Sequence, residues 1–208
     1  MTLSPPAIPR MPDLQVTPHI GGKYAAFLTE ARAQMPENEA LKLELHAQFG
    51  LADRNRYNLE VFLSIAELVG HHWRLLTEMA GAEQDLVRAY AAAQKSQHRR
   101  AVGQLVAAYN RIDRIERERE RTLHELQQVW EMSRYPRGQS VGGRDFVDVN
   151  DDTKDYWAQR RPDLRYLTAP EESIGLKEWQ KSLRGVMEAY AKQHNVPVRG
   201  LAEARLEE

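Results

Sequence analysis

Apolar residues recur at intervals of three and four positions through the middle of the chain, a spacing that places each set on one face of a helix. The positions that follow it are Leu59, Phe62, Ala66, Val69, Trp73, Leu76, Val102, Leu105, Tyr109, Ile112, Leu123, Leu126 and Trp130. They predict a helical hairpin or three-helix core over residues 53–134. The fold class that follows is all-α: a helical bundle with one very long helix, then a long irregular loop and a C-terminal helix.

Glycine, proline and capping residues predict where these helices begin and end. Residues 23–34 form one expected helix, which Pro36 should stop because proline lacks a backbone donor. Residues 37–49 form a second, ending near Gly50. Asp53 or Asn55 is expected to cap the next helix, and Gly81 to break it before a separate segment over residues 82–95. The longest helix is expected over residues 99–133.

The composition divides the chain into four parts. Five of the ten prolines fall in residues 1–20, which predicts a loose arm or an interdomain linker. Residues 21–134 form the helical core and residues 135–175 an irregular loop segment. The loop has an extended stretch over residues 145–149 and one helical pass over 154–159. Residues 176–208 form the last helix and a charged tail. An irregular segment of this length in a compact domain is more often functional than idle.

The overall charge gives no reason to expect a nucleic-acid or membrane partner. The sequence contains 29 basic and 30 acidic side chains, and 42% of its residues are hydrophobic, which is an ordinary composition for a globular protein. No stretch approaches the roughly 18 apolar residues of a membrane span, and no signal peptide opens the sequence. The absence of cysteine excludes disulfides and thiol chemistry. We expect no cofactor, and the cellular compartment stays open.

The most charged stretch, residues 111–121, alternates arginines with acids. Interleaved carboxylates would repel phosphate, so the pattern favours a salt-bridged helix over a nucleic-acid helix. The apolar seam nevertheless continues through it and places Glu116 and Arg119 beside Ile112 and Ile115. We therefore expect these four residues to form an interface, in a homodimer or with another protein.

Candidate metal sites are incomplete. His124-Glu125 begins like a zinc-protease motif, but position 128 is glutamine where the second histidine should stand. Asp148, Asn150 and Asp152 have the spacing of a calcium loop, which lacks its glycine and its final acid. We predict no metal site from either pattern.

Adjacent His71 and His72 lie about 100° apart on a helix, so they do not share a face as paired ligands would. One is expected to be packed and hydrogen-bonded and the other to lie at the surface. The alternative is a role in a pocket beside Trp73 and Arg74.

The irregular loop segment is the other candidate site, because it combines arginine guanidinium groups, carboxylates and the face of an aromatic ring, all of which suit the binding of a sugar. The residues concerned are Arg137, Arg144, Asp151, Asp152, Asp155 and Trp157. The alternative is that these charges pair with one another and Trp157 fills the helical core. No catalytic constellation appears anywhere in the chain: it contains no nucleophile elbow, Walker loop or dinucleotide fingerprint, and Asp151 and Asp152 are neighbours rather than facing carboxylates.

Six short segments carry a family resemblance. They are Asn58-Leu-Glu-Val-Phe-Leu-Ser64, His72-Trp-Arg-Leu-Leu76, Val129-Trp-Glu-Met-Ser-Arg-Tyr-Pro-Arg-Gly138, Ser140-Val-Gly-Gly143, Asp151-Asp-Thr-Lys-Asp-Tyr-Trp157 and Pro170-Glu-Glu-Ser-Ile-Gly-Leu176. These packing and loop phrases, within residues 50–195, resemble the helical region that follows the catalytic barrel in some bacterial family 20 glycoside hydrolases, the β-N-acetylhexosaminidases.

The resemblance implies a non-catalytic accessory domain that supports a catalytic barrel or dimerisation, with carbohydrate nearby. The family's catalytic Asp-Glu pair lies on a (β/α)₈ barrel, and this chain has no alternating strand-helix pattern to form one. No catalytic residue is therefore carried over, and whether the chain is part of an enzyme stays open. The alternative is a stand-alone helical interaction or dimerisation protein with no sugar involvement.

Overall fold

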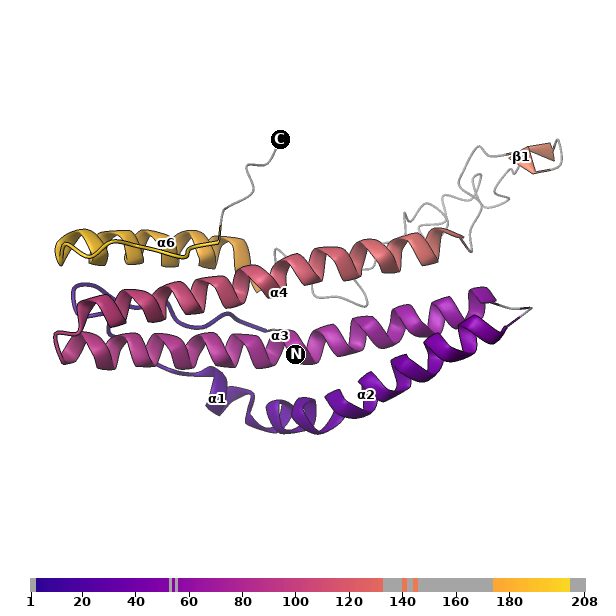
Figure 1. The fold of residues 1–208 in the computed structure, drawn as a ribbon, viewed down its shortest axis with the longest axis horizontal. Coiled ribbons are helices and arrows are strands. Elements are labelled where there is room, and N and C mark those ends of the chain that lie inside the picture. Colours follow the sequence, from indigo (N-terminus) through magenta and orange to yellow (C-terminus); the bar gives the residue numbers. More distant parts are fainter. Residues whose placement is uncertain are drawn as a thin grey trace, which may run out of the picture.

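The computed structural model describes residues 3–52, 54, 56–132, 140–141, 144–145 and 174–202 (Figure 1). Its helices are α1 (Ile20–Lys23), α2 (Ala25–Leu51), α3 (Arg56–Gln94), α4 (His98–Met132) and α6 (Leu176–Gln193). Two strands of two residues each, β1 (Ser140–Val141) and β2 (Arg144–Asp145), pair antiparallel. The fold is all-α, as the apolar spacing predicts. No helix in the described part of the chain combines the length and apolar character needed to cross a membrane.

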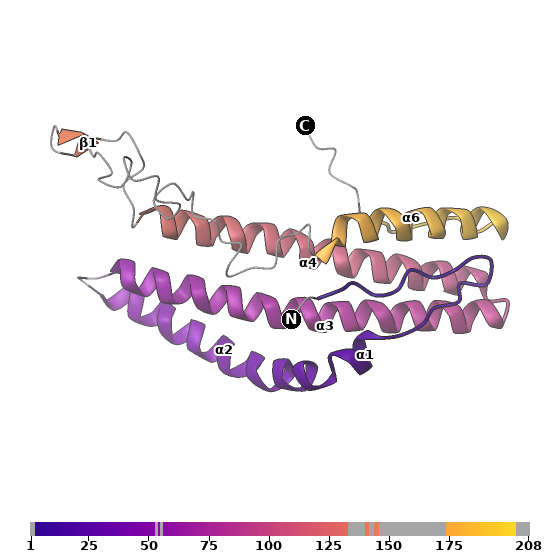
Figure 2. The ribbon, with the colours of Figure 1, turned by 180° about the vertical axis from the view of Figure 1, so that it is seen from behind.

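Helices α3 and α4 form a long antiparallel hairpin, and the other two long helices pack on its two outer sides. Helix α2 contacts α3, and α6 contacts α4. Figures 1 and 2 show that these two additions are staggered along the hairpin: α6 lies beside the α3–α4 turn, whereas most of α2 lies beside the opposite half. Each half of the hairpin therefore gains a third helix on a different side.

The core lies between α3 and α4 in the half of the hairpin near the turn, and it continues under α6. The large side chains that are fully buried among the described residues include Leu14, Ile20, Tyr24, Leu75, Met79, Leu86, Leu105, Ile112, Ile115, Leu176, Leu183 and Tyr190. Leu75, Met79, Leu86, Leu105 and Ile112 keep the three-four spacing of amphipathic helices, which explains why both helices turn this face inward. Of the N-terminal residues in this list, Leu14 comes from a segment without regular helical structure, Ile20 opens α1, and Tyr24 lies between α1 and α2.

Residues 3–19, here called the N-terminal strap, pack on the helices instead of forming a loose arm or free linker. Leu14 is fully buried in the core, and the Trp179 indole of α6 donates a hydrogen bond of 2.6 Å to the Pro6 carbonyl. The backbone amide of Ser4 donates to the Tyr24 hydroxyl at 3.1 Å. Prolines prevent a helix here, but their carbonyls and apolar rings still allow an extended segment to dock.

The expected helix end at Pro36 is wrong, because α2 runs without interruption from Ala25 to Leu51. Proline removes one intrahelical hydrogen bond and crowds the preceding turn, a local cost that tertiary packing can offset. Leu28 and Ala31 before the proline, and Asn38 after it, are buried. Figure 1 shows the result as a curved helix that follows the hairpin.

The expected break at Gly81 is also wrong, since α3 continues through it and, at 39 residues, exceeds the 35 of α4. A Cβ atom at Gly81 would lie 3.0 Å from the Arg111 guanidinium carbon, so the glycine gives Arg111 room beside α3. Its role is to permit close approach of a side chain. Helix α4 itself agrees with the predicted bounds to within one residue at each end.

Candidate functional site: a charge cluster inside the helical bundle

Arg74 lies at the meeting point of α2, α3 and α4 and contacts a carboxylate from each. Its guanidinium donates to Glu118 of α4 through Nε and to Glu39 of α2 through NH1 at 3.1 Å. NH2 lies 3.7 Å from Glu67 of α3. Lys42 closes the group, with Nζ 2.8 Å from Glu39 and 3.1 Å from Glu67. We call these five residues the Arg74 cluster.

Two small features of the sequence let α2 approach this cluster. Asn38 is buried, and its side-chain amide donates to the Ala66 carbonyl of α3 at 3.1 Å. A Cβ atom at Gly70 would lie only 2.5 Å from Asn38 Nδ2, so the approach requires glycine at this position. The hydrogen bond of Asn38, together with the space left by the absence of a side chain at Gly70, sets the position at which α2 crosses α3.

His71 is fully buried beside the cluster, with its Nδ1 atom 3.5 Å from Glu118 Oε1. Neither ring nitrogen makes a hydrogen bond to a described residue, which corrects the expectation that the packed histidine would be hydrogen-bonded. Burial disfavours the charged imidazolium and lowers the pKa of His71 to about 4, although Glu118 opposes the shift. His71 is therefore neutral near pH 7.

Its neighbour His72 is half-buried, with a ring centroid 6.3 Å from that of His71. Burial and the nearby Arg119 charge lower the pKa of His72 as well. Both shifts favour the neutral form of the imidazole.

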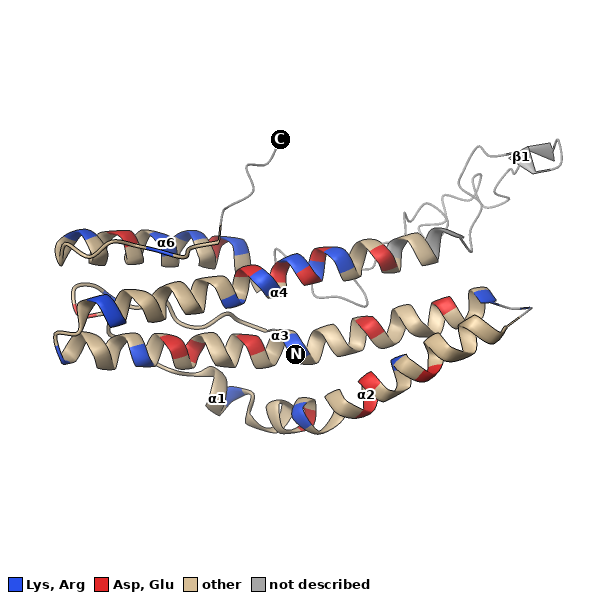
Figure 3. Cartoon of the chain, in the orientation of Figure 1, with Lys and Arg blue, Asp and Glu red and all other residues tan. Residues whose placement is uncertain are grey.

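A second group of charges continues along the same seam toward the α3–α4 turn. Arg111 of α4 donates to Asp85 at 3.2 Å and to Glu78 at 2.8 Å, both on α3. Arg114 also reaches Glu78, at 3.0 Å. The alternating charges of residues 111–121 visible in Figure 3 therefore make ion pairs to a neighbouring helix as well as along α4 itself.

The chemistry of these clusters is that of paired ions holding helices in register. The carboxylates of Glu39, Glu67 and Glu118 each face a guanidinium or an ammonium group, so none is positioned as a free acid or base. Within the part of the chain that the structure describes, no group of three or more potential ligands could hold a metal ion. Desolvation of the charged groups offsets much of their attraction in partly buried ion pairs, so the net contribution of these pairs to stability is small.

The four residues predicted as an interface lie inside the chain. Ile112 is 0% exposed, Ile115 2%, Glu116 6% and Arg119 2%. The prediction that the apolar seam passes through Glu116 and Arg119 holds, but these residues offer no surface to another molecule. Which segments of the chain cover a helix face depends on tertiary packing, which the spacing of apolar residues does not give.

Most of the predicted sugar-binding residues lie outside the described part of the chain. These are Arg137, Asp151, Asp152, Asp155 and Trp157, together with the Asp148, Asn150 and Asp152 pattern. Arg144 falls in β2, where the strand pairing with Val141 is described and the side chain is not. His124 is exposed and its Nε2 atom lies 2.9 Å from the Gln128 side-chain amide.

Sequence reasoning missed Glu83, the residue that binds the end of the strap and the start of α1. The Glu83 carboxylate accepts the backbone amides of His19, Ile20 and Gly21 at 2.7, 2.9 and 3.3 Å. The sequence signal for Glu83 was an acidic residue within the apolar pattern of α3, between Met79 and Leu86. A buried acid requires partners, and the sequence does not say that they come from a segment 62 or more positions away.

At the far end of the bundle, two histidines join the start of α4 to the end of α6. The His98 Nδ1 atom lies 2.8 Å from the Tyr190 hydroxyl, and the His98 and His194 rings stack with centroids 3.7 Å apart. Burial raises the pKa of Tyr190, which keeps its phenol neutral.

Comparisons of the chain with protein-family models, curated proteins and solved structures gave no match.

Proposed function

We propose that this chain is a non-catalytic helical accessory module that holds a neighbouring protein part in a fixed orientation. The observation that carries the proposal is the N-terminal strap. An extended, proline-rich segment that would ordinarily be a flexible tether is fixed to α3 through the bond from His19 to Glu83 and to α6 through the bond from Trp179 to Pro6. A part attached before the strap would be held by contacts spread over the bundle instead of swinging freely.

The resemblance to the helical region of family 20 glycoside hydrolases gives the finer proposal. The neighbouring part would be a β-N-acetylhexosaminidase-type barrel, and the helical module would support that barrel or its dimerisation. In support, the described carboxylates of the charge clusters are engaged with cations, and none faces another across a cleft as a glycosidase pair does.

A stand-alone helical interaction protein is the second candidate, and exposed apolar side chains on α2 and α3 favour it. Leu43 is 71% exposed, Phe62 59% and Ile65 46%. Large exposed apolar side chains that gather together mark interaction surfaces. This candidate requires no sugar and no barrel.

Activity and stability measurements separate the candidates. The purified chain should not hydrolyse an aryl N-acetylglucosaminide above background, and turnover that disappears when one of its own carboxylates is substituted would contradict the accessory proposal. A reading frame continuous with this one that encodes a barrel supports the finer proposal. That barrel should then lose thermal stability when the helical module is removed. A module that binds partners in the absence of any encoded barrel supports the second candidate.

A further inference from the structure

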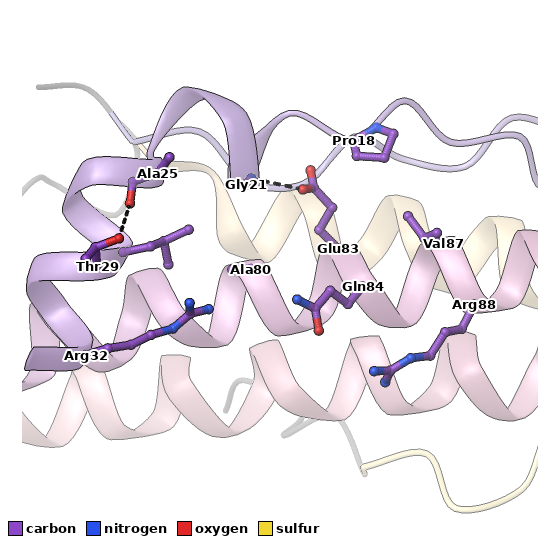
Figure 4. Close-up of a pocket in the computed structure, with 11 residues that line it drawn as sticks. Pro18, Gly21, Ala25, Thr29, Arg32, Ala80, Glu83, Gln84, Val87 and Arg88 are labelled. Carbon is purple, nitrogen blue, oxygen red and sulfur yellow. Dashed lines mark hydrogen bonds between the residues drawn. The ribbon is translucent and has the colours of Figure 1, made fainter.

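The start of α2, helix α1 and the second half of α3 enclose an open groove with about 480 Å³ of space. Pro18 of the N-terminal strap forms part of one wall (Figure 4). The groove exists because α2 leaves the surface of α3 here, while the strap and α1 cover only the edge beside Glu83. Its volume lies within the range of pockets that bind small molecules or short peptide segments.

The floor of the groove is apolar. Leu28 and Ala80 are buried at its base, and Val87 of α3 remains 37% exposed within it. Ala25 extends this surface along α2. An aliphatic side chain placed here would be removed from water on several sides, which is the main source of affinity in peptide recognition.

The charge that the groove presents to solvent is positive. Glu83 lines it, but the Glu83 side chain is only 7% exposed and its oxygens already accept three backbone amides. Arg32 makes no ion pair with a described residue and is exposed. The Arg88 side chain is 63% exposed and shares Asp85 with Arg111. Figure 4 shows Arg32 and Arg88 on the edge away from Pro18, with Gln84 between them.

We propose that this groove docks an acidic amphipathic segment of a partner protein, with aliphatic side chains on the floor and carboxylates paired to Arg32 and Arg88. Guanidinium groups bind carboxylates through charge-assisted, often bidentate hydrogen bonds. The groove is a hollow between α1, α2 and α3, a shape that suits a peptide segment better than a flat anionic membrane surface. The inference does not depend on the proposed function, since either candidate function can include such a partner.

Fluorescence anisotropy with a labelled helical peptide of Leu, Ala and Glu tests the proposal. The full chain should bind this peptide at low salt and should not bind the matched peptide in which every Glu is Lys. The double variant Arg32→Glu/Arg88→Glu should weaken binding by about tenfold or more, as the loss of two charge-assisted contacts requires. Val87→Asp should weaken it about as much by placing a like charge on the apolar floor. These positions are exposed, so folding should be retained and is checked by circular dichroism.

Arg99→Glu/Arg100→Glu, in the first turn of α4 outside the groove, reverses the same number of charges and is the matched control, which should change affinity by less than about twofold. Equal weakening by this control would show nonspecific charge attraction and overturn the proposal. Failure to bind the acidic peptide at roughly millimolar concentration would also overturn it. So would binding to phosphatidylserine vesicles that is lost in the double variant while the peptide does not bind.

Discussion

The Glu83 carboxylate accepts the backbone amide of Ile20 at 2.9 Å, joining residues 63 positions apart in the chain. The same carboxylate binds the amides of His19 and Gly21. Glu83→Ala should therefore leave buried backbone donors without partners and lower the free energy of unfolding by about 2–3 kcal/mol. Urea denaturation measures this loss.

Release of the strap should also be visible by limited trypsin digestion, because Arg10 and Lys23 flank the segment that Glu83 holds. Faster cleavage at these two sites is expected in Glu83→Ala and not in Glu30→Ala, which alters an exposed acid of α2. An unchanged cleavage rate would show that other contacts are sufficient to hold the strap.

Trp179 anchors the strap from the other side of the bundle through its 2.6 Å hydrogen bond to Pro6. Trp179→Phe keeps most of the apolar volume but leaves the Pro6 carbonyl without its donor, at a cost of about 1–3 kcal/mol. Trp179→Ala also creates a cavity, so it should cost about 3–5 kcal/mol. The side chain of half-buried Trp73 makes no hydrogen bond to a described residue, so Trp73→Phe should have a smaller effect on the urea midpoint.

His71 predicts a specific dependence of stability on pH. Its pKa is about 4 in the folded chain, whereas the unfolded chain has the ordinary histidine value of 6.5, so the unfolded chain binds the proton more readily. The contribution of His71 to the free energy of unfolding is therefore fully present above pH 6.5 and decreases as the pH drops from 6.5 toward 4. Below about pH 4 it does not change further. The difference between the two pKa values corresponds to about 3 kcal/mol.

The variant His71→Leu isolates this contribution, since every other titrating group is retained. Its free energy of unfolding should fall less between pH 7 and pH 4 than that of the natural chain, by about 3 kcal/mol. Denaturation curves at several pH values measure the difference. Parallel pH profiles for the two proteins would show that His71 is not the group responsible.

Two glycines in helices should respond in opposite ways to alanine. Gly103 of α4 has no atom within 4 Å of the position a Cβ would take, so Gly103→Ala should stabilise the chain by about 0.5–1 kcal/mol through helix propensity. At Gly70 the new methyl would lie 2.5 Å from Asn38 Nδ2. Gly70→Ala should therefore displace the Asn38 hydrogen bond and be less stable than Gly103→Ala. Thermal unfolding of both variants measures the ordering, and equal stabilisation would contradict the packing described for α2.

Ile115→Asp separates burial within the chain from burial between chains. Ile115 is 2% exposed, so an aspartate there should cost more than about 3 kcal/mol of folding stability at any protein concentration. Ile65→Asp, at a position 46% exposed, should change stability by less than about 1 kcal/mol. Light scattering alongside urea denaturation gives both readings. A folded Ile115→Asp chain with a reduced mass would restore this face as an intermolecular interface.

Helix periodicity was sufficient to predict the fold class and the bounds of α4, because an amphipathic pattern of 35 residues requires only local spacing to read. It failed at Pro36 and Gly81 because both residues weaken an isolated helix. In the folded chain, contacts around Asn38 and Arg111 offset that weakness. Local rules rank the propensity of a segment, whereas the outcome depends on what packs beside it.

The candidate site was less predictable, because its residues belong to segments far apart in sequence. Arg74 meets Glu39 and Glu118 from two other helices, and nothing in the spacing of these charges indicates that they converge. His71 and His72 did stand out, and one of the two was expected to be packed, without an indication of which. The absence of a hydrogen bond to its ring from the described residues depends on the packing of α4 against α3, which sequence alone does not give.

The staggered placement of α2 and α6 has a consequence for how the molecule opens. Each covers a different half of the α3–α4 hairpin, so one can detach while the other keeps its own contacts. Amide hydrogen exchange should then divide the bundle into cooperative units, with the slowest exchange in the hairpin near its turn and separate, faster rates for α2 and α6. The strap joins α2 to α6, because it leads directly into α1 and α2 and its Pro6 carbonyl accepts a hydrogen bond from Trp179 of α6. Cutting it should make the two units exchange more independently, without altering the hairpin between them.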